Sequence, residues 1–226
     1  MSDQVHRVPD RDDAVATVQL RPLGTPLPLG FIGLAAGAFV VSGLQLDWIA
    51  FWEARVVALV LLAFTFPTQL FAAVLGFRCR DSVVGTALAV LAATWLATGA
   101  ILGAGPPGGV SKALGLLLLV SGVALLVPVG AGGRSRVLVS GVLGLAALRF
   151  LLTGVYELSG VNGWEVAAGV TGLVSAALAL YAALAFAVED THDRAVLPVG
   201  RAGGRPPVGP RGPGGVAAEP GVRPQL

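Results

Sequence analysis

Residues 82–111 read SVVGTALAVLAATWLATGAILGAGPPGGVS and contain no ionisable side chain. A helix needs about 20 mostly apolar residues to cross the hydrocarbon core of a bilayer, because each residue adds about 1.5 Å. Apolar residues lie around the whole circumference of this run, as expected of a helix that contacts both lipid and other helices. The run therefore predicts a membrane-spanning helix, and its GPPGG cluster at 105–109 predicts a loop.

Five further stretches share this character, at residues 22–46, 56–77, 113–133, 137–156 and 166–188. Each is long and apolar enough to cross a bilayer as a helix. Among them, only 137–156 carries an ionisable charge, which is Arg149. The intervening loops are short, which is typical of one compact bundle. We therefore predict an all-α, polytopic membrane protein with six transmembrane helices over residues 22–199.

The composition excludes several classes of function. Hydrophobic residues make up 55% of the chain and charged residues 12%, against about 45–50% and 25% in soluble domains. The net charge of +2 is too small for a nucleic-acid-binding surface. Cys79 is the single cysteine, and the two histidines, His6 and His192, lie in polar flanking segments. We therefore expect no enzyme activity, no metal ion, no cofactor and no nucleic-acid partner.

Basic residues concentrate on one side of the predicted membrane. That side holds Arg7, Arg11, Arg21, Arg78, Arg80, Arg134, Arg136, Arg194, Arg201 and Arg205. The loops on the opposite side hold only Arg55 and Lys112. Because cytoplasmic loops carry the excess of Lys and Arg, we predict that both termini are cytoplasmic. The preference for Arg over Lys is typical of GC-rich bacterial genomes, so we expect the protein in the bacterial inner (plasma) membrane.

Polar segments flank the bundle at both ends. Residues 1–21 include four aspartates and precede the first apolar run, so that run is a transmembrane helix and not a removable signal peptide. Residues 200–226 are rich in Gly, Pro and Arg, and we expect them to form a disordered cytoplasmic tail. The stretch RPPVGP at 205–210 suits an aromatic groove on a partner, which leaves a non-transporting membrane scaffold as an alternative function.

Arg149 lies twelve residues into the fifth predicted helix, roughly 18 Å along its axis and near the bilayer midplane. Placing a guanidinium at that depth costs roughly several kcal/mol of free energy, unless the group faces a partner, a cavity or water. One interpretation is an anion-attracting group beside a pore. A second is a structural ion pair with Glu157 or Glu165, and a third is a side chain that extends to the outer surface.

The segment Pro67-Thr68-Gln69 lies in the middle of the second predicted helix. Proline removes one helical hydrogen bond and frees a backbone carbonyl. The freed carbonyl either faces a permeation path or belongs to a plain kink, in which Thr65 and Gln69 bond to adjacent helices.

Two other patterns lie within the apolar runs. Thr86, Thr94 and Thr98 follow at steps of eight and four, so they either line a wet channel or bond back to their own helix. Small residues also recur at spacings that favour close helix–helix approach. These are Gly33 and Gly37, Gly115 and Gly122, and Gly141 and Gly144.

Several short stretches resemble one known family of membrane proteins. Residues 25–30, TPLPLG, resemble the Asn-Pro-Ala-Pro-Leu-Gly signature of the acetate uptake transporter family (acetate/succinate transporters). Residues 194–200, RAVLPVG, are similar to that family's closing Val-Leu-Pro-Ile-Gly string. Between them, an ungapped register also matches Gln69-Leu70-Phe71-Ala72, Thr86-Ala87, Trp95, Arg136-Val137-Leu138 and Gly163-Trp164. The resemblance covers residues 25–200, which is nearly the whole membrane part.

The resemblance implies passive or proton-coupled passage of small monocarboxylates, acetate above all and succinate in some members. It also implies a homo-oligomer, a hexamer in which each protomer has its own pore. The implied substrate-binding residues are Thr25, Pro26, Pro28, Gly30, Gln69 and Thr86. The implied pore constriction consists of Leu34, Leu91 and Leu145.

The chain departs from the family pattern at functional positions. Thr25 replaces the family's asparagine, and Leu34 and Leu91 replace two aromatic residues of the constriction. A leucine ring still closes a pore by dewetting, but it lacks the tyrosine hydroxyl. Arg149 has no family counterpart and follows Leu145 by one helical turn, so we hypothesise that it supplies a cation there. The departures leave open a channel for another small solute, such as ammonia.

Overall fold

The computed structural model describes residues 24–132, 136–192 and 196–200. Within them, six helical segments are long and apolar enough to cross a membrane, as the sequence predicts. The second segment, Phe51–Arg78, is built from η2 (Phe51–Glu53), α2 (Ala54–Val60), η3 (Leu61–Thr65) and α3 (Phe66–Arg78). The others are α1 (Leu27–Gln45), α4 (Ser82–Ala104), α5 (Lys112–Gly132), α6 (Val137–Ser159) and α7 (Asn162–His192). The described residues form no strand, and the fold is all-α.

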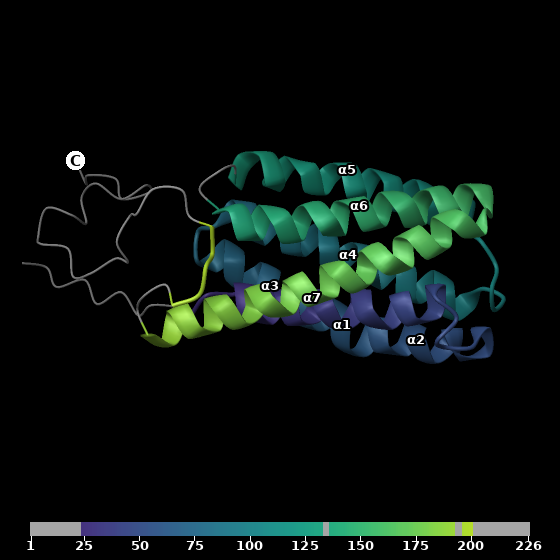
Figure 1. Ribbon diagram of the computed structural model, residues 1–226, viewed down its shortest axis with the longest axis horizontal. Helices are drawn as coiled ribbons and strands as arrows, with labels where there is room; N and C mark the ends of the chain where they lie inside the picture. Colours follow the sequence, from purple (N-terminus) through teal and green to yellow (C-terminus); the bar gives the residue numbers. More distant parts are fainter. Residues whose placement is uncertain (1–23, 133–135, 193–195, 201–226) are drawn as a thin grey trace, which may run out of the picture.

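The helices run up and down along the long axis of the molecule (Figure 1). We call the end where α1 begins and α7 finishes the terminal end, and the opposite end the distal end. The most extensive contacts join α5 with α6, α1 with α7, α3 with α4, and α6 with α7. The predicted N-terminal tail (residues 1–21), all of the predicted C-terminal tail (residues 200–226) except Gly200, and the predicted cytoplasmic residues Arg134 and Arg194 lie outside the described residues.

Several predicted helix bounds differ from the observed ones, and three of the differences are informative. The first helix begins at Leu27 and not at residue 22, because Pro26 and Pro28 suit only the first turn of a helix. The third span finishes at Ala104, before the Gly-Pro-Pro loop that the sequence predicts. The last helix continues to His192, so its final turn is polar and lies beyond the predicted apolar run, which ends at residue 188.

Glycines allow α5 and α6 to approach closely. A Cβ atom placed on Gly154 would lie 2.9 Å from the carbonyl oxygen of Gly115, and one placed on Gly122 would lie 3.0 Å from that of Ala147. Helices in lipid associate through such close contacts, because lipid tails are as apolar as leucine. The close-approach interpretation is confirmed for Gly115 and Gly122. An added Cβ atom on Gly144 would have nothing within 4 Å, so for this glycine only packing between protomers stays a prediction.

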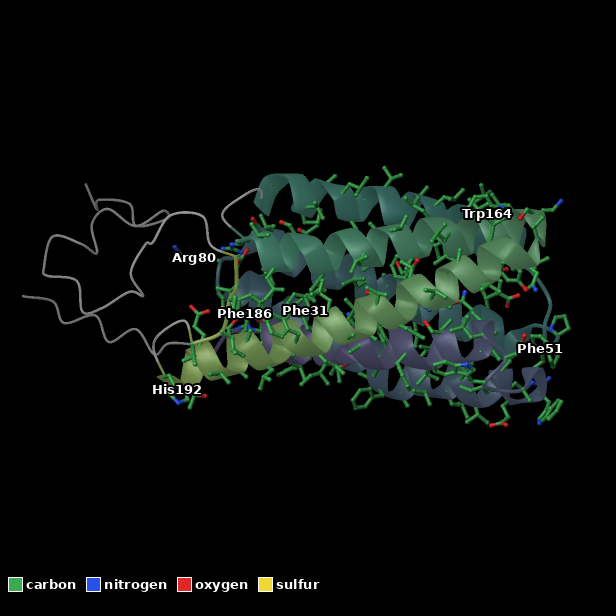
Figure 2. The ribbon with its side chains drawn as sticks, viewed as in Figure 1. Phe31, Phe51, Arg80, Trp164, Phe186 and His192 are labelled. Atoms are coloured by element: carbon green, nitrogen blue, oxygen red, sulfur yellow. The ribbon has the colours of Figure 1, made fainter. Side chains whose placement is uncertain are left out.

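Aromatic contacts connect the helices in the core. Phe31 of α1 and Phe186 of α7 lie with ring centroids 6.2 Å apart, in the terminal half of the bundle (Figure 2). Trp95 of α4 meets Phe150 of α6 edge to face, with centroids 5.5 Å apart. Such pairs add about 0.5–1.5 kcal/mol beyond the burial of the rings.

The terminal end is closed by polar contacts and by the segment that follows α7. Asp81 caps the N-terminus of α4 through the backbone N–H of Val84, and its other carboxylate oxygen pairs with Arg136 at the start of α6. Residues 196–200 then run back toward α6 (Figure 1). Tyr181 donates a hydrogen bond of 3.0 Å to the carbonyl of Pro198, and Val199 is buried.

Candidate functional site

The segment around residues 25–30 forms the start of α1. The hydroxyl oxygen of Thr25 accepts a 3.4 Å hydrogen bond from the backbone N–H of Leu27, while Pro26 is buried and Pro28 is half-buried. Gly30 is buried, and its carbonyl accepts a 3.2 Å hydrogen bond from the side-chain amide of Gln69. The structure therefore brings Gly30 and Gln69 together from two helices that the sequence places 39 residues apart.

The break in the second span is a π-helical turn. This turn, η3, ends two residues before Pro67, and π-turns within α-helices often occur at functional sites. The hydroxyl of Thr68 donates to the carbonyls of Phe64 and Thr65, at 2.8 and 2.9 Å, and so satisfies backbone oxygens at the break. The kink interpretation is thus confirmed for Gln69, which bonds to an adjacent helix, while the Thr65 hydroxyl has no hydrogen-bond partner.

Two glycines of α1 let the second span approach the centre of the bundle. A Cβ atom on Gly33 would lie 2.5 Å from Thr68 Oγ1 and 3.0 Å from Gln69 Cγ. One helical turn farther, a Cβ atom on Gly37 would lie 2.6 Å from Thr65 Cγ2 and 3.2 Å from Trp95 Cε2. Close approach at this pair of glycines, as predicted, places polar side chains of the second span against α1.

Arg149 lies in the distal half and is 2% exposed. Its guanidinium carbon lies 5.2 Å from the ring centroid of Trp95, which makes a cation–π contact. Its Nη2 donates a long hydrogen bond of 3.4 Å to Oε1 of Gln45, and Nε has no hydrogen-bond partner. The Gln45 amide in turn donates to the Thr153 hydroxyl at 3.3 Å. The side chain therefore has aromatic and amide neighbours, and no ion pair joins it to a carboxylate of the described residues.

Neither structural alternative for Arg149 holds. Its burial excludes a side chain that extends to the surface. Glu157 instead accepts a 2.6 Å hydrogen bond from the backbone N–H of Ser111, and Glu165 lies near Tyr156. Both carboxylates thus contact groups at the distal end, and the predicted ion pair is wrong.

Gly172 of α7 makes room for the guanidinium. A Cβ atom there would lie 2.5 Å from Arg149 Nε and 3.2 Å from its Cδ, and would also collide with the Ser42 hydroxyl. Ser175 lies one turn from Gly172 on α7, and Ser42 lies on α1. Both serines are fully buried, and neither hydroxyl has a hydrogen-bond partner. Four helices, α1, α4, α6 and α7, thus supply the surroundings of Arg149.

Six buried side-chain polar atoms of the described residues have no hydrogen-bond partner, and we call this set the polar column. In the described part of the chain these atoms are Gln69 Oε1, Thr65 Oγ1, Trp95 Nε1, Arg149 Nε, Ser42 Oγ and Ser175 Oγ. Five of them adjoin successive levels of α1 or belong to it: Gln69 lies beside Gly33, Thr65 and Trp95 lie beside Gly37, and Ser42 and Arg149 both lie beside Gly172. Most buried polar groups in proteins are satisfied, so a set of unsatisfied ones calls for an explanation.

Comparisons with known proteins identify the family. The sequence model of the GPR1/FUN34/yaaH family matches residues 10–201. The chain belongs to this family. A search of curated proteins found no match. Among solved structures, the chain is similar to one described as the bacterial acetate channel SatP, with a TM-score of 0.71 and 23% sequence identity. The similarity covers 79% of this chain and 100% of that one, so the two share a fold.

Membership of the GPR1/FUN34/yaaH family confirms the resemblance to acetate uptake transporters. The three leucines that the resemblance assigns to the pore constriction differ in burial. Leu34 and Leu91 are buried in one apolar cluster. Leu145 is half-buried and lies outside that cluster. Leu34 and Leu91 thus belong to the buried core, whereas Leu145 does not.

The predicted row of threonines does not continue along one face of α4. Thr86 is exposed on the outside of α4, away from the other candidate residues, whereas Thr94 and Thr98 are buried. Both buried hydroxyls bond back to α4, at the carbonyls of Val90 and Thr94, over 2.7 and 2.8 Å. Thr94 also bonds to Ser121 of α5 at 2.9 Å. Back-bonding, one of the two predicted alternatives, is confirmed for these two residues.

Sequence reasoning missed most neighbours of Arg149. Ser42 and Gln45, at a spacing of three, lie in an otherwise apolar run, and Gly172 and Ser175 repeat that spacing. Residues three apart share a helix face, so each pair marks a face that bears polar or small residues. That signal is present in the sequence, but only the fold shows that the two faces meet at Arg149. In the described residues, no group of three or more His, Cys, Asp or Glu side chains is arranged to hold a metal ion.

Proposed function

We propose that this protein carries small monocarboxylates, acetate above all, across the bacterial inner membrane. The observation that carries the proposal is the polar column, whose unsatisfied groups pass from Gln69 in the terminal half to Arg149 in the distal half. A carboxylate that leaves water needs hydrogen-bond donors along its route, together with an apolar surface for its methyl group. Family membership and the fold shared with an acetate channel support the same conclusion.

The proposed route begins at the terminal end, at residues 25–30. Thr25, Pro26, Pro28 and Gly30 form the start of α1, and Gln69 contacts Gly30 from the second span. Leu34 and Leu91 then provide the apolar constriction that opens and closes by dewetting, with Leu145 beside it. Thr86 faces outward from the protomer, so a substrate-binding role for it would require a neighbouring subunit.

Uptake of radiolabelled acetate into proteoliposomes tests the proposal. Acetic acid leaks through lipid, so the assay is run well above the pKa of acetic acid and compared with empty liposomes. We expect saturable uptake, and dependence on an imposed pH gradient would separate proton coupling from passive passage. Unlabelled succinate as a competitor tests whether dicarboxylates share the route. Absence of uptake by folded protein would contradict the proposal and would favour a different solute.

We propose that the terminal end faces the cytoplasm. Arg78, Arg80 and Arg136 lie at this end, whereas the distal end carries Trp48, Trp52 and Trp164, whose exposed rings suit the headgroup layer. Cys79, the single cysteine, is exposed in the loop between α3 and α4. A membrane-impermeant maleimide should therefore label Cys79 in inverted vesicles and not in intact cells, and the reverse pattern would contradict this orientation.

We propose a homo-oligomer, a hexamer by family resemblance, in which each protomer contains its own polar column. Large apolar side chains are exposed on several spans, and some of these surfaces would contact neighbouring subunits instead of lipid. Native mass spectrometry from detergent would give six subunits. A monomer in mild detergent and in lipid nanodiscs would contradict the oligomer without affecting the proposed route.

A further inference from the structure

The Arg149 site holds a cation that the protein itself does not neutralise. The guanidinium has five N–H donors, yet among the described residues it is given one long bond to Gln45 and the face of Trp95. An amide oxygen and an aromatic ring carry no full negative charge. A charge at this depth is costly unless it is paired, so the site has more donor capacity than the described protein has acceptors.

Further donors lie on the helices that pack around Arg149: Trp95 and Ser42 adjoin the guanidinium site, and Ser175 lies one turn from Gly172 on α7. The Trp95 indole N–H is buried without a partner, and so are the hydroxyls of Ser42 and Ser175. The Gln45 amide nitrogen donates a hydrogen bond to the Thr153 hydroxyl, and this second bond fixes the orientation of the amide. A guanidinium fork, an indole N–H and two hydroxyls together match an oxygen-bearing anion, which only accepts hydrogen bonds.

The surroundings also limit the size of the anion. Trp95 lies over the guanidinium, and the backbone of Gly172 approaches its Nε so closely that even a methyl group would collide. The planar fork of arginine pairs with the two oxygens of a carboxylate. A carboxylate with a short apolar substituent fits this combination of donors and aromatic surface better than a branched or bulky anion.

We propose that Arg149, Trp95, Ser42 and Ser175 form an anion-binding site in the distal half of each protomer, which holds a small monocarboxylate in its ionised form. The proposal rests on the proposed function and deepens it, because it specifies which protonation state of the substrate the protein binds. It assigns selectivity to a charged side chain, whereas the terminal half of the column offers only neutral groups.

Tryptophan fluorescence tests the site without transport. Trp48, Trp52 and Trp164 are exposed and are replaced by phenylalanine, which leaves Trp95 as the reporter beside Arg149. Sodium acetate is titrated against acetamide, which has nearly the same shape and no charge. We expect a saturable change in Trp95 emission with acetate and none with acetamide. An equal response to both, or no response to acetate in the folded protein, would overturn the proposal.

Two matched variants locate the response. Arg149→Gln removes the buried cation, and Arg55→Gln removes an exposed one from the second span. We expect the acetate response to disappear in the first variant and to persist in the second. A response retained in Arg149→Gln would overturn the proposal. If that variant does not fold, the titration of the unaltered site against acetamide still decides the question.

Flux measurements separate this proposal from the proposed function. Acetate uptake that persists unchanged in Arg149→Gln would overturn the anion site and leave the transporter assignment intact. A Trp95 response to acetate in a protein without acetate uptake would do the opposite, because the site would exist without the proposed transport. We expect uptake to fall at least about tenfold in Arg149→Gln, which corresponds to about 1.4 kcal/mol.

Discussion

The two halves of the polar column differ in charge. In the terminal half, Gln69 is neutral and donates a 3.2 Å hydrogen bond to the backbone of Gly30. In the distal half, Arg149 is cationic, and its closest hydrogen-bond acceptor among the described residues is the amide of Gln45 at 3.4 Å. Both side chains are almost fully buried. The fold therefore tolerates an unsatisfied amide oxygen in one half and an unneutralised cation in the other.

This difference indicates a division of roles along the column. An unsatisfied neutral group costs about 1–3 kcal/mol, which a helix bundle can absorb. A buried cation is more costly and is typical of substrate or ion pathways in membrane proteins. In the terminal half, the free Gln69 oxygen can accept from the hydroxyl of a neutral acid, and the Thr65 hydroxyl can donate to either form. The cation of the distal half favours the anion.

The largest effect on stability is expected when the buried cation of Arg149 is replaced by an uncharged side chain. We expect Arg149→Met to raise the free energy of unfolding of the ligand-free protein by on the order of 2–3 kcal/mol, because it removes a buried charge. The lost cation–π contact with Trp95 reduces this gain. Unfolding in mixed micelles of increasing denaturing-detergent content measures it. A destabilised variant would show that Arg149 is a structural residue.

A second substitution disrupts the packing around Arg149 in the distal half without altering any charge. Gly172→Ala places a Cβ atom in collision with the guanidinium and Ser42. We expect a loss of about 1–3 kcal/mol of stability from overpacking, together with loss of the Trp95 response to acetate. Gly130→Ala on α5 is the matched control, because a Cβ atom added there has nothing within 4 Å. Equal behaviour of both variants would contradict the close approach at Gly172.

A third change alters the terminal half. Gln69→Leu removes one hydrogen bond and one unsatisfied oxygen together, so we expect the free energy of unfolding to change by less than about 1 kcal/mol. Acetate uptake should fall several-fold, while the Trp95 response to acetate should remain. Loss of that response in Gln69→Leu would show that the two halves are one site.

The smallest expected effect concerns a hydroxyl beside the cation. Ser175 is fully buried and its hydroxyl has no partner, so Ser175→Ala should leave stability unchanged or raise it by about 1 kcal/mol. Its affinity for acetate, measured through Trp95, should fall two- to fivefold, about 0.4–1 kcal/mol. An unchanged affinity would remove Ser175 from the site and leave Arg149 in it.

The sequence predicts the architecture well because membrane spanning depends on local composition. A run of uncharged residues must be helical in lipid, since its backbone groups have no other partners there. The six spans could therefore be located, while their ends could not. Because of Pro26 and Pro28, α1 begins five residues later than predicted, and α7 extends beyond its apolar run as far as His192.

The candidate site could be predicted only in part. Arg149 is conspicuous in its own helix, but its hydrogen-bond partner Gln45 is 104 residues away in the sequence. The fold sets contacts of that kind, and the predicted partners Glu157 and Glu165 were attractive only because they lie nearby in sequence. The row of threonines is incomplete for a related reason, because a spacing of eight residues places Thr86 off the helix face occupied by Thr94.

The most direct test of the account is the pH dependence of acetate exchange at equal internal and external pH. Above the pKa of acetic acid, the neutral form falls about tenfold for each pH unit, whereas the ionised form stays nearly constant. If the protein binds the anion at Arg149, tracer exchange between about pH 6 and 8 should exceed that of empty liposomes by a growing factor, and Arg149→Gln should lose this excess. Exchange that falls tenfold per pH unit in parallel with empty liposomes, in both proteins, would contradict the account.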